Sequence, residues 1–187
     1  MKVSPVTEAL MYAGLILAVV LAVGWFLSYT AVRLDRLHHR IQATAAALDA
    51  QLVRRADAAL EVALGGHLDP ATATLLATAA NAVMGAGGAW TPERAAAESE
   101  LTGVLQAAST TLETMREHED EAAVEGFDRL RGAGVRVQLA RRFHNEAVRD
   151  VTALRGSWVV RWFRLAGHAR MPRPVTFEDA WPQIAVD

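Results

Sequence analysis

The chain has 187 residues and carries 19 lysines and arginines against 21 aspartates and glutamates, for a formal net charge of −2. A charge balance this close to zero argues against a dedicated nucleic-acid-binding protein, which concentrates positive charge. The sequence has no cysteine, which excludes disulfides, thiolate metal sites and a cysteine nucleophile. Aromatic residues make up only 6% and alanine is abundant, so the composition favours helices over sheets.

The first apolar segment is long enough to cross a membrane. Residues 9–27 contain no charged side chain, and as a helix they extend about 28 Å, close to the hydrocarbon thickness of a bilayer. Tyr12 stands near one end of this run, and Trp25 and Tyr29 stand near the other, where interfacial aromatic residues concentrate. We therefore predict that residues 1–29 form an N-terminal tail and a transmembrane helix.

Two alternatives to a transmembrane helix are weaker. A cleaved signal peptide needs small residues just after its apolar run, whereas the small residues 22–24 lie inside the run and bulky Trp25 and Phe26 follow them. A buried core helix needs a polar face toward water, and this segment has none.

The charges that flank the apolar run predict its orientation. Lys2 and Glu8 precede the run, whereas three arginines follow it closely, namely Arg33, Arg36 and Arg40. Cytoplasmic flanks carry an excess of lysine and arginine. We therefore predict a single-pass protein of the cell membrane whose C-terminal part is cytoplasmic.

Four helices are predicted after the membrane segment. Residues 30–64 contain neither proline nor glycine and repeat apolar side chains at three- and four-residue steps, which predicts a long helix that continues the span. Asp69-Pro70 and Thr91-Pro92 are typical helix starts, since a capping side chain precedes proline at the first helical position. They open two predicted helices, which end near residues 84 and 115, and the last long helix is predicted over residues 122–154.

The short connections between these helices predict the fold class. It is an all-α protein in which the N-terminal transmembrane helix continues into an up-and-down antiparallel four-helix bundle with long first and last helices. The bundle domain is predicted over residues 30–156.

The third predicted domain, residues 157–187, combines an amphipathic Arg/Trp segment with a proline-containing tail that we expect to be extended. In an even-numbered antiparallel bundle, the last helix returns toward the membrane. Aromatic side chains and arginines then separate on residues 157–173 as on an interfacial helix at anionic lipid. The membrane-surface candidates are Trp158, Arg161, Trp162, Phe163 and Arg164. In the alternative interpretation, the aromatic side chains cap the bundle core.

Several stretches of the chain together resemble the marked stretches of one known family. Residues 140–150 (ARRFHNEAVRD) combine an Ala-Arg pair, an aromatic residue, Asn and Ala-Val, as that family's signature does. Residues 51–57 (QLVRRAD) resemble the family's other marked stretch, and Tyr29 and Phe177-Glu178 fall where the family places such residues. The chain is thus similar to a divergent LemA protein. The resemblance implies a membrane-anchored antiparallel helical bundle and supplies no enzymatic reaction, because the family's biochemical role is largely undefined.

These two stretches also contain the polar residues that we single out: Gln51, Arg54, Arg55, Asp57, Arg141 and Asn145. Arg141 and Asn145 lie one helical turn apart and face the same way. If the first and last long helices are neighbours, Asp57 or Gln51 can pair with Arg141. A partnered polar group in a helix seam can fix register, and we favour this structural role over a ligand site.

The patterns that carry chemistry are weak. His118 lies within the charged stretch 116–121, but consecutive helical residues point in different directions and do not converge on a metal. His38 and His39 are expected at the lipid headgroups, and His144 is a group that can titrate near neutral pH. Phosphate-loop and serine-elbow spacings do not occur. We therefore predict no enzymatic activity, no cofactor and no metal site.

Three functions are compatible with the sequence. The first is a non-catalytic scaffold or adaptor that binds a protein partner at the membrane. The second is a lipid-sensing or membrane-organising module that acts through residues 157–173. The third is a metal-dependent enzyme that uses His118 and its acidic neighbours. The expected partners are the lipid bilayer and a protein, and nucleic acid is not expected.

Overall fold

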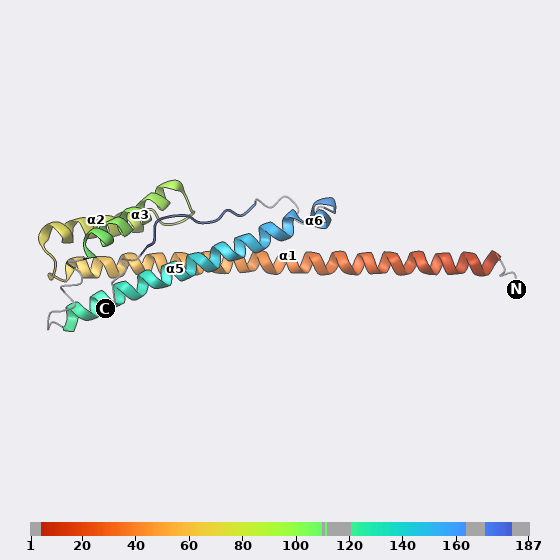
Figure 1. Cartoon of the computed structure of the whole chain (residues 1–187), viewed down its shortest axis with the longest axis horizontal. Helices are drawn as coiled ribbons and strands as arrows, with labels where there is room; N and C mark the ends of the chain where they lie inside the picture. Colours follow the sequence, from red (N-terminus) through yellow and green to blue (C-terminus); the bar gives the residue numbers. More distant parts are fainter. Residues whose placement is uncertain (1–4, 110, 112–120, 164–170, 181–187) are drawn as a thin grey trace. The chain divides into compact units, whose positions relative to one another are not determined.

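The computed structural model describes residues 5–109, 111, 121–163 and 171–180 (Figure 1). Every regular element in these residues is a helix, which confirms the all-helical prediction and the long apolar helix at the N-terminus. The helices are α1 (Pro5–Leu64), α2 (Pro70–Gly85), α3 (Pro92–Ala107), α5 (Glu121–Gly156) and α6 (Trp158–Trp162).

The predicted helix starts are confirmed in atomic detail. Asp69 caps α2, since its Oδ1 accepts hydrogen bonds from the backbone N–H groups of Ala71 and Thr72, each at 3.1 Å. Thr91 caps α3, since its Oγ1 accepts from the N–H of Arg94 at 3.2 Å. Each cap satisfies donors that have no partner within the helix. Proline follows both caps at a position where no N–H is needed.

One predicted boundary is wrong. We expected the third helix of the bundle to reach residue 115, but α3 ends at Ala107. Ala108 forms a turn that interrupts the helix, and Ser109 and Thr111 are helical again. Residues 112–120 lie outside the described part of the chain.

The chain divides into two compact units. The first unit comprises Met1–Arg40 and Val148–Pro172, and the second comprises Ile41–Ala147 and Arg173–Asp187. This division falls within α1 and within α5. It differs from the predicted domain boundaries at residues 29/30 and 156/157, which stay predictions.

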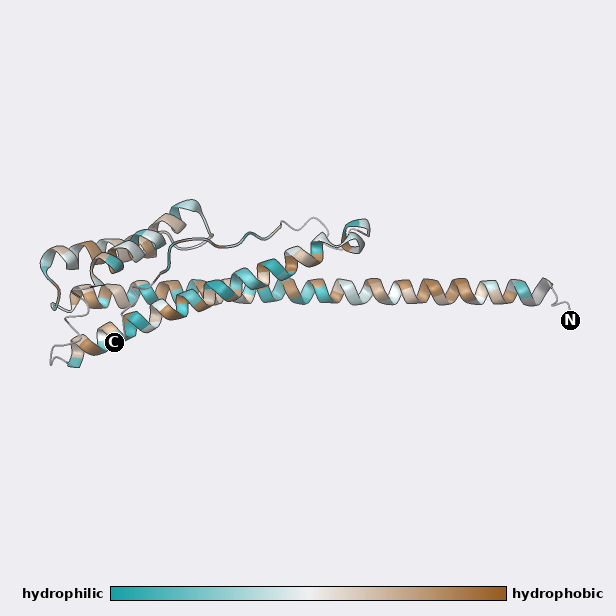
Figure 2. Cartoon of the chain, viewed as in Figure 1, coloured by the Kyte–Doolittle hydropathy of each residue, from teal (hydrophilic) through white to brown (hydrophobic). Residues whose placement is uncertain are grey.

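The first unit contains an apolar helical run that is exposed in the described part of the chain. α1 is long and apolar enough to cross a membrane, and none of its most apolar window is buried. In Figure 2 this part of α1 is coloured mostly as hydrophobic residues along its length. A helix that is apolar on every side needs an apolar surrounding. These observations agree with the predicted span in length and composition.

In the first unit, the end of α5 lies beside α1 beyond the apolar run. Arg40 forms an ion pair with Asp150 at 3.0 Å, which places the end of α5 beside α1. Thr30 and Leu34 are buried although the neighbouring residues on α1 are exposed, and Val160 of α6 is buried as well. Within this unit, the end of α5 therefore lies against α1 near Arg40.

The second unit has a core to which four helices contribute. The stripe Ala56, Ala59 and Val62 of α1 packs with buried side chains of α2, α3 and α5, among them Leu76, Leu101, Leu105, Phe127 and Leu130. The many alanines in this core allow the helix backbones to approach closely. Two contacts at opposite ends, Glu61 to Arg129 and Thr44 to His144, show that α1 and α5 run antiparallel.

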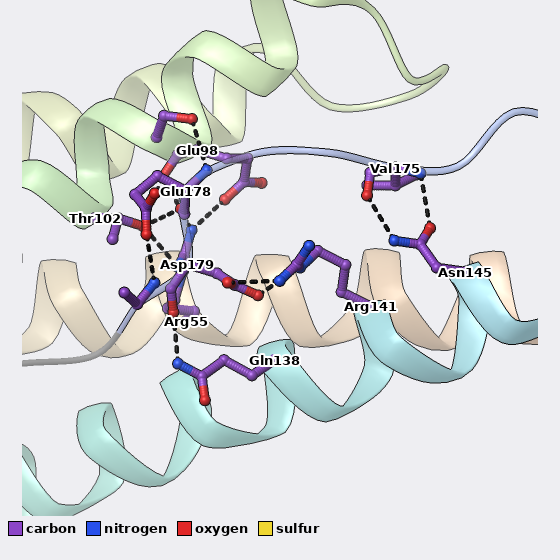
Figure 3. A network of polar contacts seen from close by, with 11 residues as sticks. Arg55, Glu98, Thr102, Gln138, Arg141, Asn145, Val175, Glu178 and Asp179 are labelled. Atoms are coloured by element: carbon purple, nitrogen blue, oxygen red, sulfur yellow. Dashed lines mark hydrogen bonds and ion pairs between the residues drawn. The ribbon is translucent and has the colours of Figure 1, made fainter. Parts of the chain in front are cut away.

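Residues 171–180 form no helix, strand or turn. Residues 173–180, here called the strap, belong to the second unit and run along its helices (Figure 3). The absence of regular structure agrees with the extended tail that the prolines predict.

Candidate functional site

The strap is held through its main chain by side chains of α5. Asn145 binds both polar groups of Val175, since its Nδ2 donates to the carbonyl at 2.9 Å and its Oδ1 accepts from the N–H at 2.8 Å. Gln138, two turns away on the same face, donates from Nε2 to the carbonyl of Asp179 at 2.6 Å. These amide groups satisfy an extended main chain in the way that a neighbouring β-strand would (Figure 3).

Side chains of α3 hold the same main chain from the other side. Thr102 donates to the carbonyl of Glu178 at 2.8 Å, and Ser99 accepts from the N–H of Glu178 at 3.1 Å. Gln106 donates to the carbonyl of Ala180 at 2.8 Å. The strap therefore lies in a groove between α3 and α5. We call it the strap groove, and its polar walls are Ser99, Thr102, Gln106, Gln138, Arg141 and Asn145.

An ion pair fixes the register of the strap in this groove. The guanidinium of Arg141 binds the carboxylate of Asp179 with two hydrogen bonds, from Nε at 2.6 Å and from Nη2 at 2.8 Å. A two-pronged pair of this kind is both stronger and more directional than a single hydrogen bond. A shift of the strap by one residue would break it.

The side chains of the strap alternate between the groove and the solvent. Val175 is buried, and the ring of Phe177 packs against Trp90 at a centroid separation of 5.3 Å. The guanidinium carbons of Arg55 and Arg141 lie 5.9 and 5.6 Å from the centroid of Phe177. The intervening Thr176 and Glu178 are exposed. This period of two is the pattern of an extended strand that is half buried.

A buried ion pair connects α1 with α3 beside the groove. Nη2 of Arg55 lies 2.6 Å from Oε2 of Glu98, and the two side chains are 2% and 0% exposed. Nη1 of Arg55 also donates to Oγ1 of Thr102 at 3.1 Å, which links the pair to the strap. Burial raises the pKa of the Glu98 carboxyl, while the Arg55 guanidinium acts in the opposite direction. Since desolvation dominates, the pair specifies how α1 and α3 fit together more than it stabilises them.

A cavity of about 870 Å³ adjoins the N-terminal end of the strap. Its walls come from α1, from the segment before α3, from His144 and from the strap itself, residues 173–176. Arg94 is buried there, binds Asp49 and the carbonyl of Gly88, and lies over the ring of Trp90. The strap therefore does not fill the space at this end of the groove.

His144 is a buried titratable group at this cavity. Its Nδ1 lies 3.3 Å from Oγ1 of Thr44, and burial lowers the pKa of the imidazole. A lowered pKa favours the neutral ring at neutral pH. The sequence-based expectation that His144 titrates near neutrality is therefore refined, since its transition is displaced toward acid.

Three of the six predicted polar residues meet at the strap, and three do not. Arg55, Arg141 and Asn145 contact Phe177, Asp179 and Val175, the residues that alternate into the groove. The other three lie on α1: Arg54 and Asp57 are exposed, and Gln51 is partly buried.

The predicted pairing of Arg141 with Asp57 or Gln51 is wrong. Arg141 binds Asp179, because the strap and not α1 faces it. Gln51 lines a smaller hollow of about 220 Å³ between α1 and α5 instead.

Sequence reasoning missed the acidic partners of both arginines. Glu98 had a recognisable signal, because Arg94, Glu98, Leu101 and Leu105 recur at three- and four-residue steps on one stripe of α3. A charge on an apolar stripe predicts a buried partner. Asp179 had no such signal, because an extended tail has no helical periodicity.

The membrane-surface candidates are exposed where the structure describes them. Trp158 and Trp162 are 72% and 78% exposed, and Val160 of α6 is buried. Phe163 and Arg161 are exposed as well. Arg164 lies outside the described residues.

Within the described ranges, no group of three or more His, Asp or Glu side chains could hold a metal ion. His118 and its neighbours, residues 116–120, lie outside these ranges, so the prediction about this cluster stays a prediction. The same holds for the expectation of no enzymatic activity and no cofactor.

No known family model matches the chain, and no curated protein matches it. The resemblance to LemA proteins therefore stays a proposal that the residues quoted above support.

Proposed function

We propose that the chain is a single-pass, LemA-like membrane protein whose helical unit is a non-catalytic scaffold for a protein partner. The observation that carries the proposal is that the two parts of α1, one unbroken helix from Pro5 to Leu64, have different surroundings. Its first part is apolar on all sides and exposed, as a span in lipid must be. Its last part contributes to the core of a folded helical unit.

The proposed architecture of residues 30–156 is an up-and-down antiparallel four-helix bundle with long first and last helices. The antiparallel contacts between α1 and α5 support it, and so does the packing of α2 against α3. The short connections from α1 to α2 and from α2 to α3 favour this topology over one with crossovers.

The scaffold role is supported by how the polar residues are used. Arg55, Arg141 and Asn145 each contact another part of the same chain. Side chains that bind other parts of the same chain stabilise one arrangement of the helices. A scaffold needs such a fixed arrangement to present a constant surface to its partner. The arginines that follow the apolar run support a cytoplasmic location for the helical unit.

Proximity labelling in cells tests the scaffold role, with the labelling enzyme fused after Asp187 and its reagents supplied separately to each side of the membrane. The proposal predicts a small and reproducible set of proteins from the cytoplasmic face. Diffuse labelling of abundant membrane proteins would contradict a scaffold. Labelling confined to the outer side would contradict the orientation.

A second candidate function, membrane organisation through α6, has a specific observation in its favour. The first unit exposes aromatic side chains that have a polar end, among them Trp25, Tyr29, Trp158 and Trp162. Aromatic residues with one apolar and one polar end concentrate at the bilayer interface. The exposed Arg161 of α6 adds the positive charge that anionic lipid attracts.

Tryptophan fluorescence tests this second function in the full chain. Variants that keep only Trp158, only Trp162 or only Trp90 are reconstituted in bilayers that contain brominated, anionic lipid. Lipid contact predicts strong quenching of Trp158 and Trp162, while Trp90 in the second unit serves as the unquenched control. Equal and weak quenching of all three would contradict lipid contact.

A further inference from the structure

The strap groove has the properties of a peptide-binding site that the chain's own strap occupies. It binds main-chain N–H and C=O groups through side-chain amides and hydroxyls, and it receives alternate side chains. Main-chain recognition of an extended segment gives affinity, and contacts for alternate residues give specificity. Nothing in this mode of binding requires the segment to belong to the same chain.

The chemistry of the groove defines the segment that it accepts. Val175 is buried against Leu48, Leu52 and Val137, so its site takes an aliphatic side chain. The site of Phe177 is bounded by Trp90 and by two guanidinium groups, an environment that suits an aromatic ring. The site of Asp179 presents the fork of Arg141, which matches a carboxylate. The specificity is therefore aliphatic-x-aromatic-x-Asp.

The strap is held in a manner that allows exchange. Among its described residues, only Val175 belongs to a buried cluster, together with Leu48, Leu52 and Val137. The other strap residues are exposed or partly exposed. Segments with few buried apolar contacts open at a lower free energy than the core does. The cavity beside residues 173–176 also leaves room at this end of the groove.

From these features we propose that the strap groove binds, in trans, an extended segment of a partner protein with an aliphatic-x-aromatic-x-Asp pattern, in competition with the strap. This inference rests on the proposed scaffold function and specifies the partner's chemistry. The strap has a high effective concentration because it is tethered. A partner segment therefore has to bind the groove tightly enough to displace the tethered strap.

Peptide binding to the purified full chain in detergent tests the proposal. The probe is a fluorescent peptide with the sequence of residues 172–180 (PRPVTFEDA). The double variant Val175→Asp/Asp179→Ala weakens the tethered strap and leaves every groove residue in place. We expect this variant to bind the probe at least about tenfold more tightly than the wild-type chain, whose strap competes.

Groove variants made in the same background report whether the peptide occupies the proposed site. Asn145→Leu removes both hydrogen bonds to the aliphatic position, and we expect about tenfold weaker binding. Arg142→Ala is the matched control, because Arg142 is exposed and adjacent to Arg141, and we expect no change. A probe peptide with Ala in place of Asp should bind as weakly as the groove variant does.

A second measurement needs no weakened strap. The chain has no native cysteine, so a spin label on Thr176→Cys reports on the strap alone, and Thr176 is exposed. Saturating peptide should convert an immobile spectrum into a mobile one. The proposal is overturned if the folded double variant does not bind the probe, if it binds peptides without the pattern equally well, or if excess peptide leaves the spin-label spectrum unchanged. Because these measurements are made in detergent, their failure is distinct from a failure of the membrane-scaffold proposal, which proximity labelling reports.

Discussion

Leucine side chains are exposed in one part of α1 and buried in the other. In the first unit, Leu17 of α1 is 60% exposed, and its apolar neighbours are exposed as well. In the second unit, Leu52 of the same helix is 1% exposed and contacts the core. The same residue type in the same backbone conformation thus needs lipid in one place and protein in the other. A helix can be assigned to a membrane by the absence of a polar face and not by its apolar content alone.

The two parts of α1 also differ in whether they contain charged residues. The apolar run 9–27 has no charged residue, whereas the last part of α1 contains Arg55, which is buried and paired. A protein core can supply a partner for a charge, and hydrocarbon cannot. The following predictions sharpen this comparison, beginning with the largest effect.

Arg55→Met is expected to destabilise the helical unit by about 3–5 kcal/mol, because it leaves the carboxylate of Glu98 buried without a counter-charge. Denaturant unfolding of the full chain in detergent measures this free energy. Arg54→Met, on the exposed neighbour, is the control and should change stability by less than about 0.5 kcal/mol. The double variant Arg55→Met/Glu98→Met should cost less than the single one. A single variant as stable as the wild type would show that the pair is not buried.

Leu52→Ala is expected to cost about 2–5 kcal/mol in the same unfolding measurement, since it leaves a cavity in the core. Leu17→Ala is the matched substitution in the other part of α1. It should leave the unfolding of the helical unit unchanged, because Leu17 contacts no protein core. Equal losses for the two variants would remove the distinction between the two parts.

Asp179→Ala is expected to release the strap, because the two-pronged pair with Arg141 is lost. Hydrogen bonds to charged groups contribute about 1.5–3 kcal/mol, so strap amides should exchange roughly 10–100 times faster. Hydrogen exchange at the N–H of Val175 measures this opening. Exchange in the core of α1 should be unaffected, and a uniform acceleration would indicate global destabilisation instead.

The smallest expected effect is a pH dependence caused by His144. Its folded pKa lies below the ordinary value of 6.5, so the unfolded chain binds the proton more readily. Stability is therefore fully present above about pH 6.5 and falls as the pH decreases through the folded pKa. His144→Gln should flatten this part of the profile, whereas substitution of the exposed His67 should not. An unchanged profile in His144→Gln would assign the effect to other groups.

Much of the fold could be predicted, because local signals and tertiary structure agree. The caps at Asp69 and Thr91 define two helix starts, and the pattern without Pro or Gly after residue 30 predicts the long first helix. The turn at Ala108 that ends α3 was not predicted, because the sequence there has neither proline nor glycine to indicate a break.

The candidate site could be predicted only in part. The family resemblance identifies Arg55, Arg141 and Asn145 as candidate polar residues, but it does not identify the residues that they bind. The partner of Arg141 is Asp179, 38 positions away in a segment without periodicity, so no local pattern connects them. The contact depends on where the strap runs, and the strap runs where it does because α3 and α5 together form the groove.

The orientation and depth of α1 are the central claim, and cysteine accessibility in intact cells tests them most directly. Since the chain has no native cysteine, the single variants Glu8→Cys, Leu17→Cys and Leu75→Cys each carry one reactive site. A membrane-impermeant maleimide should label Glu8→Cys from outside, leave Leu17→Cys unlabelled, and reach the exposed Leu75→Cys only after permeabilisation. Labelling of Leu17→Cys from water, or of Leu75→Cys in intact cells, would contradict the account.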